Sequence, residues 1–182
     1  MKYSYIGHYK IAVIAVWAAA VFFSTVFLKD NIIEFLAMRP VSAGLTVQFY
    51  GDPRAAMKIG NHYFNVYDSG VYDLERAEKY FSRALELDST TPDAWHQLAR
   101  IEFLRGNFGG ALREINKQIE LHGDSFMAAF YIRGLILGYM GNFQYAESDF
   151  KKFLMWDPKN WAAHNDLAWI YFKAGDYSKA EE

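Results

Sequence analysis

The sequence predicts an all-α fold in which one membrane-spanning helix precedes a row of antiparallel helix pairs, an α-solenoid. The first observation is a small residue that recurs at intervals of 34, 35 and 34 residues, as Ala77, Ala111, Ala146 and Ala180. The second observation is that each alanine follows a glycine-containing turn, such as Gly141-Asn142-Phe143. A period of about 34 residues with such turns is typical of helix–turn–helix repeats. The third observation is an uncharged apolar run at residues 11–28.

Length and composition bound the possible functions. With 182 residues, the chain has room for one ordinary domain and a short appendage. Apolar residues make up 52% and aromatic residues 18%, which is enough for a packed core. The net charge of -2 provides no basic field, so we expect no nucleic-acid partner. The absence of cysteine excludes disulfides, thiolate metal sites and cysteine nucleophiles.

Residues 11–28 are the candidate membrane anchor. The run holds 18 residues without a charge and is bounded by Lys10 and Lys29. As a helix it would extend about 27 Å, close to the thickness of a bilayer's hydrocarbon core. A signal peptide cleaved near residues 18–20 is the alternative. Because the apolar run continues to Leu28, we expect an uncleaved single-pass anchor in the lipid bilayer, with residues 1–10 as its flank.

Basic residues at the two ends of the anchor predict its orientation. Lys2, Lys10 and the α-amino group precede the apolar run, whereas Lys29 and Arg39 follow it. This small excess predicts a cytoplasmic amino terminus and places the repeats on the extracytoplasmic (periplasmic) side. The following linker, residues 29–52, has the pattern of a short amphipathic helix. It could lie on the membrane or against the first repeat, but we expect a stiff connector without a specific partner.

Residues 53–182 repeat one pattern four times. The second copy has Trp95, Leu98 and Ala99, followed by Ala111 and Ile115. Equivalent residues in the other copies are Gly60, Tyr63, Ala77 and Phe81; Phe130, Gly134, Leu137, Ala146, Phe150 and Pro158; and Leu167, Ala168, Tyr171 and Ala180. This pattern resembles the tetratricopeptide repeat (TPR) family, whose helix pairs carry Trp-x2-Leu-Gly-x2-Tyr, Ala-x3-Phe and Pro. The resemblance implies about three and a half repeats, at residues 53–91, 92–126, 127–160 and, incompletely, 161–182.

Small residues and departures from the repeat pattern predict local packing. Small residues in the first helices should let the two helices of a pair approach closely, at Gly60, Ala99, Gly134 and Ala168. The first repeat carries several extra residues, so we expect a longer first helix or a looser turn. Arg133 replaces the leucine of the pattern; we expect it to extend along a helix edge, with a partner-facing or interhelical polar contact as the alternative. Because stacked repeats need a capped end, we expect the natural chain to continue past Glu182.

Motifs of enzyme chemistry do not occur in the sequence. Neither a nucleophile elbow, nor a zinc-protease helix, nor a phosphate-binding or dinucleotide-binding loop can be found. The five histidines are scattered, and none has a second ligand type at metal spacing. Carboxylates such as Glu75 and Glu78 fit solvated helix faces. We therefore predict no catalytic residue, no cofactor and no metal site.

The TPR resemblance implies where a protein partner would bind. In this family the first helix of each pair lines a concave groove that holds partner segments. Position by position, the groove residues are Arg54, Met57, Asn61, Phe64 and Asn65; His96, Arg100 and Phe103; Tyr131, Leu135 and Tyr139; and Asn165, Trp169, Phe172 and Lys173. Asn61 and Asn65 resemble part of the family's clamp for peptide carboxy-termini, but the third repeat lacks the matching cations. The aromatic groove instead suits an amphipathic helix or an extended apolar segment, unless some of its rings belong to the interlayer core.

These observations favour a non-enzymatic, membrane-anchored adaptor whose groove binds a protein partner. It would act as an assembly factor or as a subunit of a membrane-associated complex. Two alternatives stay open. One is a targeting receptor or chaperone-docking module that binds many client segments transiently. The other is the recognition arm of an enzyme whose catalytic part lies beyond residue 182.

Overall fold

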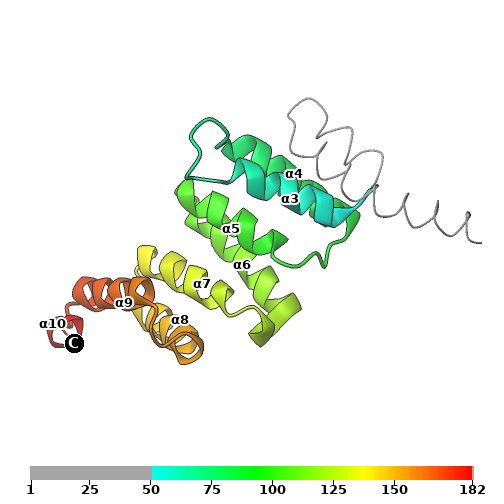
Figure 1. The fold of residues 1–182 in the computed structure, drawn as a ribbon. Coiled ribbons are helices and arrows are strands. Elements are labelled where there is room, and N and C mark those ends of the chain that lie inside the picture. Colours follow the sequence, from blue (N-terminus) through cyan, green and yellow to red (C-terminus); the bar gives the residue numbers. More distant parts are fainter. Residues whose placement is uncertain (1–50, 182) are drawn as a thin grey trace, which may run out of the picture. The chain divides into compact units, whose positions relative to one another are not determined.

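The computed structural model describes residues 51–181, which form eight α-helices, one short 3-10 helix and no strand (Figure 1). The predicted anchor at 11–28 and the predicted linker helix lie outside these described residues. Within residues 51–181, no helix combines the length and the hydropathy that crossing a bilayer requires. The helices are α3 (Pro53–Tyr63), α4 (Leu74–Leu87), α5 (Ala94–Leu104), α6 (Phe108–His122), η1 (Gly123–Ser125), α7 (Ala128–Tyr139), α8 (Phe143–Trp156), α9 (Trp161–Ala174) and α10 (Tyr177–Ala180).

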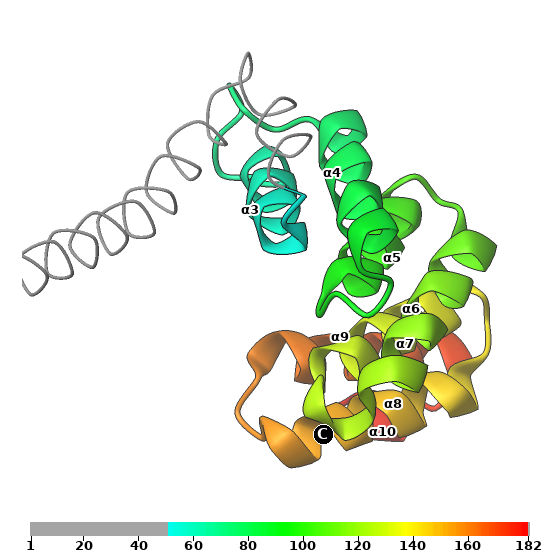
Figure 2. The same ribbon diagram turned by 90° about the vertical axis from the view of Figure 1, so that its right-hand side faces the viewer.

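Successive helices pack as pairs that follow one another in a row (Figures 1 and 2). α3 packs on α4, α5 on α6, α7 on α8 and α9 on α10, and each second helix also packs on the first helix of the next pair. Among the first helices, α5 contacts α7 and α7 contacts α9. The predicted all-α solenoid of antiparallel helix pairs is therefore confirmed for the described residues.

Short polar side chains and glycines set the ends of the helices. The Asp52 carboxylate accepts a hydrogen bond from the backbone N–H of Arg54 at 2.8 Å, and the Asn160 side chain accepts one from Ala163 at 3.0 Å. Each satisfies an N–H that the first turn of a helix leaves unpaired. Gly141, in the turn after α7, has a φ of 80°, a conformation that costs glycine little.

Two phenylalanines with no exposed surface, Phe81 and Phe150, occupy the centre of the first and third helix pairs. A glycine on the facing helix makes room for each ring. A Cβ at Gly60 would lie 2.5 Å from Cε1 of Phe81, and one at Gly134 would lie 3.2 Å from the Phe150 ring. The prediction that small residues let paired helices approach is confirmed at these two positions.

Arg133 forms an interhelical ion pair. Its Nε and Nη2 donate to the two carboxylate oxygens of Asp149 at 2.7 and 2.8 Å, and its Nη1 donates to Asn116 at 3.1 Å. Asp149 is only 5% exposed, so the guanidinium neutralises a carboxylate inside the α7–α8 pair. Our expectation that Arg133 extends freely along a helix edge is wrong, and the polar-contact alternative holds.

The extra residues of the first repeat lie in its turn. α3 and α5 both contain 11 residues, so the first helix is not lengthened. Residues 64–73 instead form a long loop between α3 and α4. Phe64 at its start is 7% exposed and packs edge-on against Phe81, whereas Tyr67 at its tip is 96% exposed. The looser turn, rather than the longer helix, is the correct alternative.

Candidate functional site

The predicted groove residues come from the four first helices and the loop after α3, and ring contacts connect them across the repeats. The Arg100 guanidinium lies over the Phe64 ring at 4.6 Å, which joins the first repeat to the second. Phe103 contacts Tyr139 edge-on at 5.2 Å, and Tyr139 contacts Trp169 at 4.9 Å. Ring contacts therefore join predicted groove residues of neighbouring repeats that lie far apart in the sequence.

We call the rings of Phe103, Phe108, Tyr139 and Trp169 the aromatic ladder. Phe108, the first residue of α6, fills the corner between its neighbours, with ring centroids 5.6 Å from Phe103 and 5.5 Å from Tyr139. Tyr139 keeps 53% of its surface exposed. The Lys173 ammonium lies 5.8 Å from the Trp169 ring centroid. The ladder is thus an amphipathic aromatic surface that spans three repeats.

Gly138 permits the close approach of α9 to α7 beside the ladder. A Cβ at this position would overlap Cδ1 of Ile170 and would lie 3.3 Å from Cζ3 of Trp169. Ile170 is only 1% exposed, so its side chain already fills the space that a larger residue at position 138 would need. The glycine therefore sets the position of the Trp169 ring against Tyr139.

A hollow of about 520 Å³ adjoins the ladder at α9 and α10. Its apolar wall includes Phe172 and Tyr177, whose rings lie 5.6 Å apart and are 57% and 62% exposed. Such volume is typical of sites that receive a large side chain or a small ligand. The residues that line the hollow are Asn165, Ala168, Trp169, Phe172, Tyr177, Ala180 and Glu181.

Other predicted groove residues hold the surface together. Met57, Phe64 and His96 are buried, with exposed fractions of 9%, 7% and 7%. The Nδ1 atom of His96 lies 2.7 Å from the Asp93 carboxylate, and its ring packs edge-on against Phe126. These side chains position the groove and offer a partner little surface.

Tyr131 and Leu135 are half-buried against the core of the third and fourth repeats. The Tyr131 hydroxyl donates to Asp166 of α9 at 2.5 Å, and its ring contacts Phe150 and Phe153. Burial, together with this bond to a carboxylate, raises the pKa of the Tyr131 hydroxyl. Tyr131 therefore ties α7 to α9.

The first-repeat end of the groove is polar. Arg54, Asn61 and Asn65 are exposed, and burial lowers the pKa of the Arg100 guanidinium, an effect that the nearby Asp93 opposes. Arg100 Nη1 donates to the side-chain carbonyl of Gln97 at 2.8 Å. At the other end Asn165, Phe172 and Lys173 are exposed. The exposed members of the predicted groove set thus change from polar at the first repeat to partly aromatic at the fourth.

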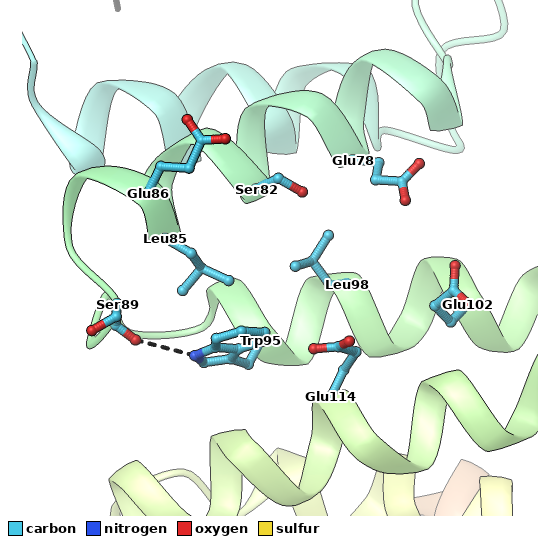
Figure 3. Close-up of a pocket in the computed structure, with 9 residues that line it drawn as sticks. All are labelled: Glu78, Ser82, Leu85, Glu86, Ser89, Trp95, Leu98, Glu102 and Glu114. Carbon is cyan, nitrogen blue, oxygen red and sulfur yellow. Dashed lines mark hydrogen bonds between the residues drawn. The ribbon is translucent and has the colours of Figure 1, made fainter.

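Sequence reasoning missed two features of the surface. Phe108 and Tyr177 begin the second helices, yet both contact groove rings; the aromatic residue in each glycine turn was the available signal. A second hollow between α4, α5 and α6 was also missed, because its carboxylates were assigned to solvated helix faces. It is lined by Glu78, Ser82, Leu85, Glu86, Ser89, Trp95, Leu98, Glu102 and Glu114 (Figure 3).

Comparison with known proteins agrees with the helix pairs described above. The tetratricopeptide repeat family matches residues 73–125 and, separately, residues 139–182. The chain is a TPR protein. No curated protein matches the sequence of this TPR protein.

Solved structures share its fold at low sequence identity. A crystal structure of MamA is 20% identical over 74% of this chain and 71% of its own, with a TM-score of 0.63. MamA 41-end from Desulfovibrio magneticus RS-1 is 18% identical over 85% of this chain and 88% of its own, with a TM-score of 0.66. The first TPR of Spaghetti (RPAP3), bound to the HSP90 peptide SRMEEVD, is 21% identical over 68% and 94%, with a TM-score of 0.61. At these identities the likeness concerns the fold alone.

Proposed function

We propose that this TPR protein is a non-enzymatic, membrane-anchored adaptor whose groove binds a protein partner within a membrane-associated complex. The observation that carries the proposal is the aromatic surface of the exposed Tyr139 and Phe172 and the half-buried Trp169 beside the 520 Å³ hollow. The anchor is the apolar run at residues 11–28. The orientation of the anchor, with the repeats on the extracytoplasmic side, is part of the proposal.

The chemistry of the groove selects the partner segment. Large exposed aromatic side chains contribute most of the binding energy in many protein interfaces. An amphipathic helix or an extended apolar segment would bury Tyr139 and Phe172, which are more than half exposed, while its polar side faces Lys173 and solvent. Fixing the groove beside a bilayer raises its effective concentration toward partners in the same membrane.

Transient docking of client segments is the second candidate, since the first TPR of Spaghetti (RPAP3) is seen with the HSP90 peptide SRMEEVD. Asn61 and Asn65 would favour a polar or acidic segment at the first-repeat end of the groove. The third repeat instead presents Tyr131 and Leu135. This apolar composition favours an apolar segment over an acidic peptide terminus.

Site-specific crosslinking tests the groove. A photoreactive phenylalanine analogue at Tyr139 or Phe172 of the full chain, in native membranes, should crosslink one partner in defined stoichiometry. The matched control is Tyr145 on α8, which is 71% exposed and not among the groove residues. Crosslinks equal at Tyr139 and Tyr145 would contradict the proposal. Many weak products from Tyr139 would favour transient client docking.

Extraction and protease protection test the anchor. The full chain should stay in the membrane pellet after alkaline carbonate treatment, and deletion of residues 11–28 should release it. In intact cells or vesicles, residues 53–182 should be digested only from the extracytoplasmic side. Release of the undeleted chain by carbonate would contradict anchoring, and digestion from the cytoplasmic side would reverse the orientation.

A further inference from the structure

The second hollow, between α4, α5 and α6, has a composition unlike that of the groove. Its volume is about 490 Å³, within the range of small-ligand and side-chain pockets. Four of its nine lining residues are glutamates, and none is basic. We call it the glutamate hollow. Figure 3 shows α4 on one side, with Glu78, Ser82 and Glu86, and α5 on the other.

The floor of the glutamate hollow is apolar. Leu85 of α4 and Leu98 of α5 point toward each other across the gap, and Trp95 lies beside them (Figure 3). All three are half-buried, so part of their surface faces the hollow. The Trp95 indole donates to the Ser89 carbonyl at 3.1 Å, which fixes the orientation of its ring. A flat ring and two aliphatic groups thus form a preformed surface for an aliphatic chain.

The carboxylates on the rim differ in how they are neutralised. Glu78 and Glu102 share the Arg105 guanidinium, at 2.7 and 3.3 Å, and Glu86 pairs with Arg83 at 2.8 Å. Among the described residues, Glu114 makes no hydrogen bond or ion pair. Burial raises the pKa of the Glu114 carboxyl and the charge of Glu102 adds to this effect, whereas the charges of Arg113 and Lys117 oppose it. One half-buried carboxylate therefore lies beside the apolar floor without an ion pair, although the charges of Arg113 and Lys117 act on it from a greater distance.

We propose that the glutamate hollow binds one arginine or lysine side chain from a basic, partly apolar segment of a protein partner. The aliphatic stem would lie on Leu85, Leu98 and Trp95, and the cationic group would lie between Glu102 and Glu114. Charge complementarity selects this occupant, because an acidic side chain would be repelled by the rim and an apolar one would leave Glu114 unpaired. Arg105, which already bridges Glu78 and Glu102, shows that this rim accommodates a guanidinium. The proposal is independent of the groove's partner.

Titration with two matched peptides tests the proposal. The full chain in detergent micelles is titrated with acetyl-Leu-Arg-Leu-amide and with the same peptide carrying uncharged citrulline. The Trp95 indole N–H resonance, assigned from the Trp95→Phe variant, reports binding. We expect saturable shifts with the arginine peptide, weakened by salt, and about tenfold weaker binding of the citrulline peptide.

Variants locate the site. Glu114→Gln should weaken binding of the arginine peptide about tenfold. Glu120→Gln, on an exposed part of the same helix, should leave the affinity for this peptide unchanged. Tyr139→Ala should also have no effect, since it alters only the groove. Equal affinity for the two peptides, no saturable shift, or equal loss in Glu114→Gln and Glu120→Gln would overturn the proposal. None of these results bears on binding at the aromatic ladder.

Discussion

The aromatic ladder and the glutamate hollow are both formed where neighbouring repeats meet, yet their chemistry is opposite. α5 contributes to both, through the successive residues Phe103 and Glu102. Successive residues of a helix point in different directions, so one helix supplies a ring to one site and a carboxylate to the other. The comparison teaches that a single solenoid can present two surfaces that need not compete for the same partner.

Packing explains why the ladder is filled and the hollow is open. At the ladder, Gly138 lets α9 approach until Ile170 and Trp169 fill the space. At the hollow, Leu85 and Leu98 face each other without closing the gap, and carboxylates that need solvent or a partner occupy the rim. We therefore expect stability at the ladder to depend on added side-chain volume, and binding at the hollow to depend on charge.

The largest expected effect is a loss of stability that should appear first at different ends of the solenoid in two variants. Phe150→Ala and Phe81→Ala should each lower the free energy of unfolding by about 3–5 kcal/mol, because both rings are fully buried. Since each repeat contacts only its neighbours, Phe150→Ala should loosen the ladder end first and Phe81→Ala the hollow end. Hydrogen exchange of α9 and of α4 measures this. Uniform loss of protection in both variants would show that the two surfaces are not separable.

Arg133→Met tests the ion pair that joins α7 to α8. Removing the guanidinium leaves the Asp149 carboxylate buried and unpaired, so we expect a loss of about 3 kcal/mol in urea unfolding. The double variant Arg133→Met with Asp149→Leu should lose less, because no unpaired charge remains. A double variant that is as unstable as the single one would show that packing, rather than charge, explains the loss.

Gly138→Ala tests whether close approach orders the ladder. The added Cβ would displace Ile170 and Trp169, at a cost of about 1–3 kcal/mol. Gly109→Ala on α6 is the matched control: its Cβ would meet nothing within 4 Å, so helix propensity should raise stability by about 0.5–1 kcal/mol. Thermal unfolding and Trp169 fluorescence measure both. Unchanged stability in Gly138→Ala would show that the Ile170 side chain moves aside without a cost in free energy.

The sequence allowed the fold to be predicted because the repeat is local: spacing, turn glycines and small residues each act within one helix pair. The partner of Arg133 could not be predicted, since Asp149 comes from another helix whose rotation decides the contact. His96 was expected in the groove but is buried, because Asp93 and Phe126 enclose it. The glutamate hollow depends on the volume left between packed helices, and a sequence pattern does not predict this volume.

The smallest expected effect is a pH-dependent change in stability, which should have opposite signs at two glutamates. Burial raises the pKa of Glu114, whereas the hydrogen bond from Lys151 lowers the pKa of Glu147 on α8. An ionised Glu114 therefore costs stability as pH rises above its unfolded pKa, while an ionised Glu147 adds stability that is lost as pH falls through its folded pKa.

Glu114→Gln should accordingly raise the melting temperature slightly at pH 7 and leave it unchanged at about pH 3, where the carboxyl is protonated in both states. Glu147→Gln should lower the melting temperature at pH 7, and this loss should shrink toward the same acidic pH. Calorimetry of both variants across this range measures the signs. A stabilising Glu147→Gln or a destabilising Glu114→Gln at pH 7 would reverse the assignment of the two environments. Arg113 and Lys117 would then already compensate the Glu114 charge, and the reason to expect an external arginine or lysine there would disappear.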